Sequence, residues 1–168
     1  MIAADVPEAW VQERLGGAGI SEAMRPGFLA ALGEAVGAEP NDLDVVLTAP
    51  GLPGTPALVL GRPEHPRARR AVLHRDDVRV LEDREGLTTV IVGRGLAGRL
   101  EVSMEVDPAA RGQGRGRAAL IEARKLAGPG EVLFAQTAPG NAASLRALLA
   151  AGFAPIGGEM LFFPTVLP

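Results

Sequence analysis

The fold is decided by VDPAARGQGRGR, residues 106–117, because this glycine-rich stretch joins two segments of different periodicity. Before it, RLEVSMEV (99–106) alternates apolar with polar residues, which is the pattern of a β-strand with one buried face. After it, residues 114–127 carry apolar residues at helical spacing, which predicts an amphipathic helix. A strand, a glycine-rich turn and a helix in this order predict an α/β unit.

Upstream of this unit the chain is dominated by strand patterns. Segments of mainly apolar or alternating residues are separated by short polar or glycine-containing turns, and this spacing predicts consecutive hairpins in an antiparallel meander. The meander strands are predicted at 71–74, 78–82, 87–93 and 99–106. Before them, 43–47 and 57–60 predict two short strands, and Pro63 and Pro66 predict a loop.

Downstream of residue 127 the pattern predicts a strand at 131–137, a helix at 141–152 and a final strand pair within 152–163. Asn141 suits the N-cap of that helix, and Gly152 suits its end. A meander followed by β-α-β-α-β predicts a mixed α/β sheet. We expect a single domain over 1–168, in which 1–60 is a helical N-terminal part with helices at 7–16 and 25–36, and 70–163 is the α/β core.

Composition excludes several classes of site and partner. The 168 residues include no cysteine and only two histidines, so disulfides, thiolate metal sites and a cysteine nucleophile are excluded, and no metal site is expected. The net charge of −3 argues against a general nucleic-acid binder. The start of the chain lacks the pattern of a secretory signal, and no apolar run is long enough to span a membrane. We therefore expect a cytoplasmic protein without a nucleic-acid or membrane partner.

The glycine-rich stretch has the features of a site for a phosphate or another oxyanion. Glycines lack Cβ atoms and so let a ligand approach the backbone closely, and the N–H groups at a helix start favour an anion. The Walker A pattern is absent because the chain's single lysine is Lys125, and the G-x-G-x-x-G spacing fails because Arg117 takes the third glycine position. A local excess of positive charge over 111–125 is contributed by Arg111, Arg115, Arg117, Arg124 and Lys125.

The spacing that does fit is R-x-x-G-x-G, formed by Arg111, Gly114 and Gly116. Here the chain resembles the GNAT N-acetyltransferase superfamily, whose acyl-CoA pyrophosphate loop has the pattern Gln/Arg-x-x-Gly-x-Gly/Ala. Asn141, Ser144 and the pair Gly152-Phe153 are similar to the superfamily's N-x-x-S/A…G-F segment. The resemblance covers roughly the last 95 residues, including the order of the predicted elements, and does not extend to 1–60.

The resemblance implies an N-acetyltransferase that uses acetyl-CoA as co-substrate and transfers the acetyl group by direct attack of an amine. It implies that the loop backbone holds the pyrophosphate, with Arg115, Arg117 or Lys125 near the outer phosphates, although each of these side chains equally suits a solvated helix face. It also implies that pantetheine pairs with the strand end at 104–106 and contacts Asn141, and that the Met104 amide meets the thioester carbonyl. The cofactor-binding candidates are Met104, Val106, Arg111, Gly112, Gln113, Gly114, Arg115, Gly116, Arg117 and Asn141.

Four side chains are candidate bases or acids for that reaction. Glu101 and Glu105 share one face of the predicted strand, and either carboxylate can take the amine proton directly or through water, unless it is an ordinary solvent-facing residue. Many superfamily members place a tyrosine near the sulfur of CoA, but that position here is Leu148, and the chain has no tyrosine. Ser144, one turn earlier, can at most assist weakly or orient a water. His74, at the end of a predicted strand, is a further candidate base.

The missing tyrosine leaves two other functions open: a non-catalytic acyl-CoA-binding sensor, or an interaction module that uses the N-terminal helices. The acceptor is not readable beyond an amine-bearing small molecule or peptide. Residues 1–50 hold eight acidic and two basic residues, which favours a cationic acceptor unless they form an ordinary acidic surface. Oligomeric state also stays open, with a homodimer among the options.

Overall fold

A computed structural model describes residues 1–17, 19 and 21–164. Its residues form two compact units: one contains Met1–Leu43 and the described residues from Glu159, and the other contains Asp44–Gly158. The single domain expected from chain length stays a prediction. The element bounds are α1 Glu8–Leu15, η1 Glu22–Met24, α2 Pro26–Val36, β1 Ala38–Pro50, β2 Val59–Leu60, α3 Pro66–Ala71, β3 Asp76–Glu82, β4 Thr88–Arg94, η2 Leu96–Gly98, β5 Leu100–Val106, η3 Pro108–Ala110, α4 Arg115–Arg124, β6 Val132–Thr137, α5 Ala142–Ala150 and β7 Ala154–Pro164.

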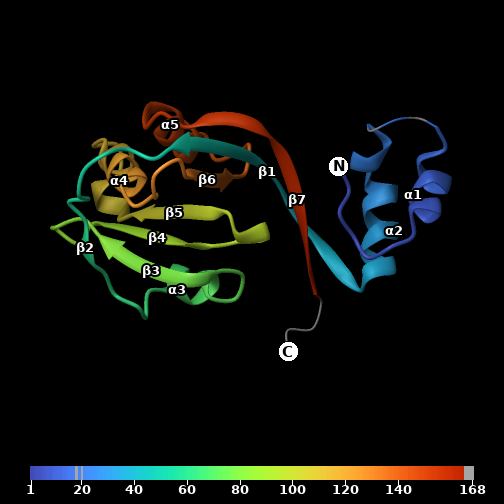
Figure 1. Ribbon diagram of the computed structural model, residues 1–168, viewed down its shortest axis with the longest axis horizontal. Helices are drawn as coiled ribbons and strands as arrows, with labels where there is room; N and C mark the ends of the chain where they lie inside the picture. The colour runs from blue at the N-terminus through green and yellow to red at the C-terminus, as the bar shows by residue number, and fades with distance from the viewer. Residues whose placement is uncertain (18, 20, 165–168) are drawn as a thin grey trace. The chain divides into compact units, whose positions relative to one another are not determined.

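The strands form one mixed sheet in the order β2-β3-β4-β5-β6-β1-β7. The pairs β2–β3, β3–β4, β4–β5 and β6–β1 are antiparallel, and β5–β6 is parallel. The predicted meander is therefore confirmed in β3, β4 and β5, followed by the predicted β-α-β-α-β order (Figure 1). The mixed α/β fold expected from the sequence is the one observed.

Helices cover both faces of the meander and its neighbour β6. On one face, α4 and α5 pack over the sheet and bury an apolar core that includes Leu47, Leu120 and Leu133, each at most 1% exposed (Figure 1). On the other face, the short helix α3 buries Ala68 and Ala71 against Ile91. Burial of apolar side chains on both faces explains why β4 reads as a continuous apolar run rather than as an alternating one.

Three local predictions are wrong. Residues 71–74 do not form a strand, because α3 occupies Pro66–Ala71, where a loop was expected, and turns follow it. Proline at the first helical position and the His65 side chain, which accepts a hydrogen bond from the Arg67 N–H, start this helix. The expected strand pair within 152–163 is instead the single strand β7. The helices predicted at 7–16 and 25–36 are confirmed as α1 and α2.

The first unit has a small core of its own. Phe28 and Leu32 of α2 are buried in it, and the Trp10 ring of α1 meets the Phe28 ring edge-on with 6.1 Å between centroids. The Arg14 guanidinium lies 3.9 Å from the centre of the Trp10 ring. An open, mainly apolar cavity of about 460 Å³ in this unit is lined by residues that include Ile2, Val6, Val11 and Leu15.

Arg124 ties three elements of the second unit together. Its Nε donates to the Pro50 carbonyl at 3.0 Å, at the end of β1, and its guanidinium also donates to the Ala151 carbonyl at 2.7 Å, just after α5. The Arg124 carbonyl accepts from the Leu52 N–H at 3.0 Å. One side chain on α4 thus satisfies main-chain carbonyls at the ends of two other elements.

Replacing this arginine is expected to destabilise the second unit. In Arg124→Met the aliphatic part stays, but two charge-assisted hydrogen bonds are lost, and the free energy of unfolding is expected to fall by about 2 kcal/mol. Urea titration followed by circular dichroism measures the change. The exposed Arg146 of α5 supplies the control, because Arg146→Met removes the same charge and should leave the midpoint within experimental error. Equal midpoints for Arg124→Met and wild type would contradict the assignment.

Candidate functional site

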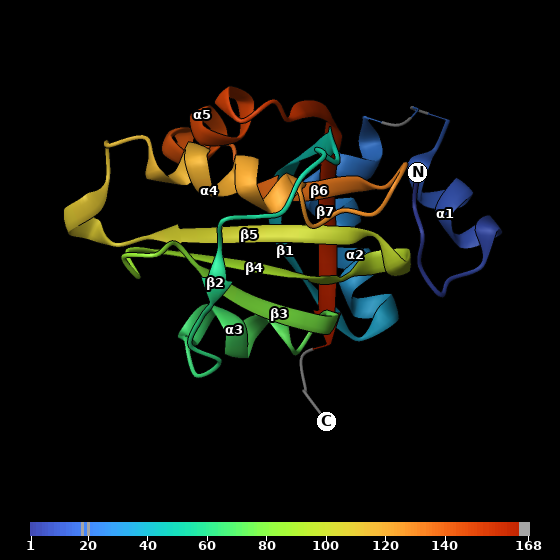
Figure 2. The same ribbon diagram turned by 60° about the vertical axis from the view of Figure 1, so that its left-hand side comes forward.

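The first feature of the site is the early end of the parallel pairing between β5 and β6. Strand β4 pairs with β5 along its whole length, from Arg94↔Leu100 to Thr88↔Val106. Strand β6 pairs with β5 only at Leu100 and Glu101. The second half of β5 therefore has a hydrogen-bonded neighbour on one side only. Figure 2 shows the chain leaving this end of β5, turning, and running back over the sheet as α4.

The ladder register determines which main-chain groups of β5 face that open side. The Asp107 N–H donates to the Leu87 carbonyl at 2.8 Å, and the Gly95 N–H donates to the Arg99 carbonyl at 3.0 Å. The main-chain N–H and C=O groups of the odd-numbered residues of β5 therefore point toward β4. Hydrogen-bonded pairs alternate along an antiparallel ladder. The N–H groups of Met104 and Val106 consequently point away from β4, on the side where the pairing with β6 has ended. This is the arrangement that a hydrogen-bonding ligand alongside β5 requires.

The glycine-rich loop that follows β5 turns through two left-handed residues. Gly112 and Gly114 both have φ +76°, a conformation that other residues rarely adopt, and Gly114 is the N-cap of α4. A Cβ at either position would meet no atom within 4 Å, so the backbone conformation demands glycine there and crowding does not. The N–H groups of the first helical turn, from Arg115 to Arg117, have no acceptor inside the helix.

The third glycine of the motif serves a different purpose. A Cβ on Gly116 would lie 2.9 Å from Cε and 3.1 Å from the sulfur of Met104. Glycine at this position lets the start of α4 lie directly against the side chain of Met104, which packs on the sheet core. The first turn of α4 and the second half of β5 are thereby held together, and the predicted cofactor-binding residues from 104 to 116 come from adjoining pieces of backbone.

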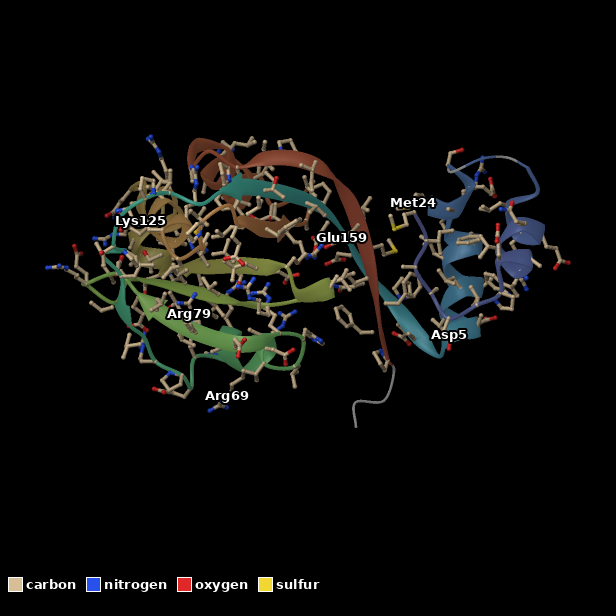
Figure 3. The ribbon with its side chains drawn as sticks, viewed as in Figure 1. Asp5, Met24, Arg69, Arg79, Lys125 and Glu159 are labelled. Carbon is tan, nitrogen blue, oxygen red and sulfur yellow. The ribbon has the colours of Figure 1, made fainter. Side chains whose placement is uncertain are left out.

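The basic side chains around the loop differ in what they contact. Arg111 donates from Nε to the Val106 carbonyl at 3.2 Å and so closes the loop on β5. Lys125, labelled in Figure 3, follows the last residue of α4 and pairs with Glu122 at 2.7 Å. Gln113 and Arg117 are exposed. Arg115, Arg117 and Lys125 were proposed for the outer phosphates. Among the described residues, Arg115 and Lys125 each form an ion pair, and Arg117 forms none.

Arg115 is held by the turn between β3 and β4. Its guanidinium donates to Asp83 Oδ2 at 3.2 Å and to the carboxylate of Glu85. The hydrogen bond with Glu85 is the main cause that raises the pKa of Arg115 above its usual value. Burial acts to raise the pKa of Asp83, but hydrogen bonds, including those from the Leu87 N–H and from Arg115, outweigh it and leave the pKa below its usual value. Both shifts favour the charged forms of Arg115 and Asp83 at neutral pH.

The candidate base Glu101 is buried among arginines. Its two carboxylate oxygens accept from Nε of Arg75 at 2.8 Å and from Nε of Arg99 at 2.6 Å. The Glu101 side chain is 8% exposed, and both arginine side chains are 13% exposed. Arg75 also donates to the hydroxyl of Ser103 at 3.3 Å. Both carboxylate oxygens of Glu101 are thus engaged by arginines, and its role as the base stays a prediction.

Glu105, two positions further along the same face of β5, is more accessible. It accepts from Nε of Arg67 at 3.2 Å, and the two side chains are 43% and 42% exposed, respectively. A pair this exposed is weak in water. His74 lies in the turns after α3 and not at the end of a strand, and its N–H donates to the Ala71 carbonyl at 3.0 Å. Of the candidate bases on β5, Glu105 has the more exposed carboxylate.

The start of α5 is built as the sequence predicted. The Asn141 side chain accepts from the Ser144 N–H at 3.1 Å and caps the helix, which confirms its structural role. Ser144 is half-buried. Leu148, one turn further on, is 4% exposed and belongs to the sheet core. A side chain as large as tyrosine would overpack this position, so Leu148 serves the core at the place where the sequence resemblance implied a tyrosine.

Sequence reasoning missed the residues that hold the candidate groups in place. Asp83 and Glu85 precede Arg115 by about thirty residues, and Arg75 precedes Glu101 by 26. Ion pairs between such distant positions leave no periodic signal in a sequence. Among the described residues, no group of histidine, aspartate and glutamate side chains is arranged to hold a metal ion. Each helix in the described part of the chain is too short or too polar to cross a bilayer.

No family model matches the chain, and no curated protein matches it. Seven solved chains have a similar fold, among them three acetyltransferases. One, from the GNAT family of Colwellia psychrerythraea, is 15% identical with a TM-score of 0.49, covering 79% of this chain and 60% of that one. A second, from the GNAT family of Novosphingobium aromaticivorans, is 20% identical with a TM-score of 0.46, covering 74% and 65%. A GCN5-related N-acetyltransferase from Sphaerobacter thermophilus is 17% identical with a TM-score of 0.45, covering 92% and 64%.

This chain thus spans less than two thirds of the length of each of these three proteins. Its own elements nevertheless have the order that the sequence resemblance implied. An antiparallel meander leads into β5, a glycine-rich loop joins β5 to α4, and β6, α5 and β7 follow. The observed mixed α/β fold thus has the element order that the resemblance to the GNAT superfamily implied.

Proposed function

We propose that this chain binds acetyl-CoA and transfers its acetyl group to a primary amine. The observation that carries the proposal is the meeting of two sets of main-chain donors at one place. The N–H groups of the loop and first turn of α4 suit a diphosphate. The Met104 N–H suits the thioester carbonyl oxygen, and the Val106 N–H suits an amide carbonyl of pantetheine. Gly116 brings the two sets together by allowing α4 to lie on Met104.

In the proposed reaction the amine nitrogen attacks the thioester carbonyl carbon, a C–N bond forms, and the C–S bond breaks. The Met104 N–H donates to the carbonyl oxygen as negative charge develops on it. Glu105 takes the proton that the amine loses, directly or through water, because its carboxylate is the more exposed of the two on β5. The thiolate of CoA leaves and takes a proton from water, which the hydroxyl of Ser144 helps to orient.

The second candidate function, a non-catalytic sensor of acyl-CoA, is favoured by Leu148. This residue stands where the resemblance implies a tyrosine, and it is buried in the core. Without a phenolic acid, the leaving thiolate depends on solvent for its proton. A sensor needs the binding elements of the loop and of β5, and it needs neither Glu105 nor Ser144. Cofactor binding and turnover are therefore tested separately.

Binding is tested by placing a carboxylate in the loop. Gly114→Glu introduces left-handed strain and a negative charge where the diphosphate is proposed to lie, so the Kd for CoA in calorimetry is expected to rise at least tenfold. Gly130→Glu is the matched control, because Gly130 also has a positive φ, of 74°, and open space around its Cβ position. It should bind CoA like wild type. If both variants bind CoA as tightly as wild type, the loop is not the diphosphate site.

Turnover is tested by following free thiol from acetyl-CoA with a panel of amines. Glu105→Gln is expected to lower kcat by about a hundredfold, with little change in the KM for acetyl-CoA, because it removes the proton acceptor and not a cofactor contact. The exposed Glu64 supplies the control as Glu64→Gln. CoA binding without thiol release from any amine would favour the sensor. Full activity in Glu105→Gln would exclude this residue as the base.

A further inference from the structure

The turn between β3 and β4 holds both ends of the proposed diphosphate loop. The Leu87 carbonyl accepts from the Asp107 N–H at 2.8 Å, where the chain leaves β5. Asp83 accepts from the guanidinium of Arg115 at 3.2 Å, where the chain enters α4. The whole loop between Asp107 and Arg115 is therefore fastened to a single turn at its beginning and at its end.

Asp83 is the residue that organises this turn. Its Oδ1 accepts from the Leu87 N–H at 2.8 Å, and its Oδ2 accepts from Arg115. Its carbonyl accepts from the Gly86 N–H at 2.9 Å, which closes the turn. The Asp83 side chain is 23% exposed. One half-buried carboxylate thus connects the turn with the first residue of α4.

Glu85 contacts the same arginine in a different way. Its carboxylate accepts from the Arg115 guanidinium, but its side chain is 63% exposed, and no other hydrogen bond to it is recorded among the described residues. The Arg115 side chain is only 22% exposed, and its Nε is buried without a partner in the described part of the chain. Two carboxylates neutralise this arginine, so Arg115 adds no net positive charge to the loop.

We propose that Asp83 is a positioning residue for coenzyme A, which acts through Arg115 and the turn to hold the loop N–H groups in place for the diphosphate. Glu85 also accepts from Arg115, but it is exposed and has no second contact that fastens the turn, so its main effect on the site is that of its negative charge. This inference rests on the proposed function, because it takes the loop as the diphosphate site. It assigns the cofactor affinity of the loop partly to a turn that lies outside the loop.

Removing Asp83 and removing Glu85 are expected to have different effects on the affinity for CoA. Removing a negative charge near an anion site by itself strengthens anion binding. Simple electrostatics therefore predicts that Asp83→Ala and Glu85→Ala both tighten the binding of CoA. Positioning predicts that Asp83→Ala weakens it, because the loop loses its fastening at Arg115 and at Leu87. Glu85→Ala, which removes the same charge from the same arginine, should leave the affinity unchanged or raise it.

The experiment measures Kd for CoA and for inorganic pyrophosphate by calorimetry on the full chain. We expect Asp83→Ala to raise both Kd values about tenfold, and Glu85→Ala to raise neither. In an Arg115→Met background, Asp83→Ala should add only a small further loss, because the residues act as a pair. With acetyl-CoA as substrate, Asp83→Ala should raise KM and leave kcat unchanged. If Asp83 had a merely structural role, Asp83→Ala would lower the melting temperature, but it would not raise the two Kd values and the KM at an unchanged kcat.

The outcomes separate this inference from the proposed function. Wild type that binds neither CoA nor pyrophosphate overturns the proposed function, and this inference with it. Wild type that binds CoA while Asp83→Ala binds it equally or more tightly overturns this inference alone. If circular dichroism shows that Asp83→Ala does not fold, Asp83→Asn decides by the same criterion, since it keeps an acceptor for the Leu87 N–H and loses the ionic partner of Arg115.

Discussion

The structure depends on the point at which β6 stops pairing with β5. Two residue pairs, at Leu100 and Glu101, are enough to join the meander to the second half of the sheet. Beyond them β5 keeps β4 as its neighbour but has main-chain donors on its other side for which the pairing supplies no partner. Main-chain donors need acceptors, and Met104 and Val106 are only partly buried, so the donors of this stretch are left to solvent or a ligand. The candidate site exists because a strand in the middle of a sheet behaves, over half its length, as an edge strand.

The alternation of β5 then separates two chemical tasks. The side chains of even-numbered residues face α4, where Met104 packs against Gly116 and fixes the start of the helix. The side chains of odd-numbered residues lie on the opposite face of the sheet, the face of α3, where Glu101 and Glu105 form ion pairs with arginines from distant parts of the chain. A period of two places the proposed proton acceptor and the proposed cofactor-binding backbone on the same strand, with the side chains of the two sets on opposite faces. The proposed reaction needs both within one short segment.

Much of this arrangement was predictable because its signals are local. The strand pattern of 99–106, the glycines of the loop and the capping by Asn141 are properties of short segments, and the structure has β5, two left-handed glycines and an N-cap at these places. The helix α3 was missed because its capping His65 and first-turn Pro66 also suit a turn. The ion pairs of Arg115 and Glu101 were missed because their partners lie in other strands and turns.

The sequence by itself determined the order of the elements, the glycine-rich turn between a strand and a helix, and the alternation that puts two carboxylates on one face. Periodicity, capping and turn chemistry act over a few residues, so they can be predicted from the sequence alone. Only the tertiary structure decided which charged side chains are engaged in ion pairs and which stay exposed to a ligand, because ion pairing depends on which strands become neighbours. Pairing of β4 with both β3 and β5 places the turn that holds Asp83 beside Arg115. The fold also buries Glu101 among arginines while leaving Glu105 exposed.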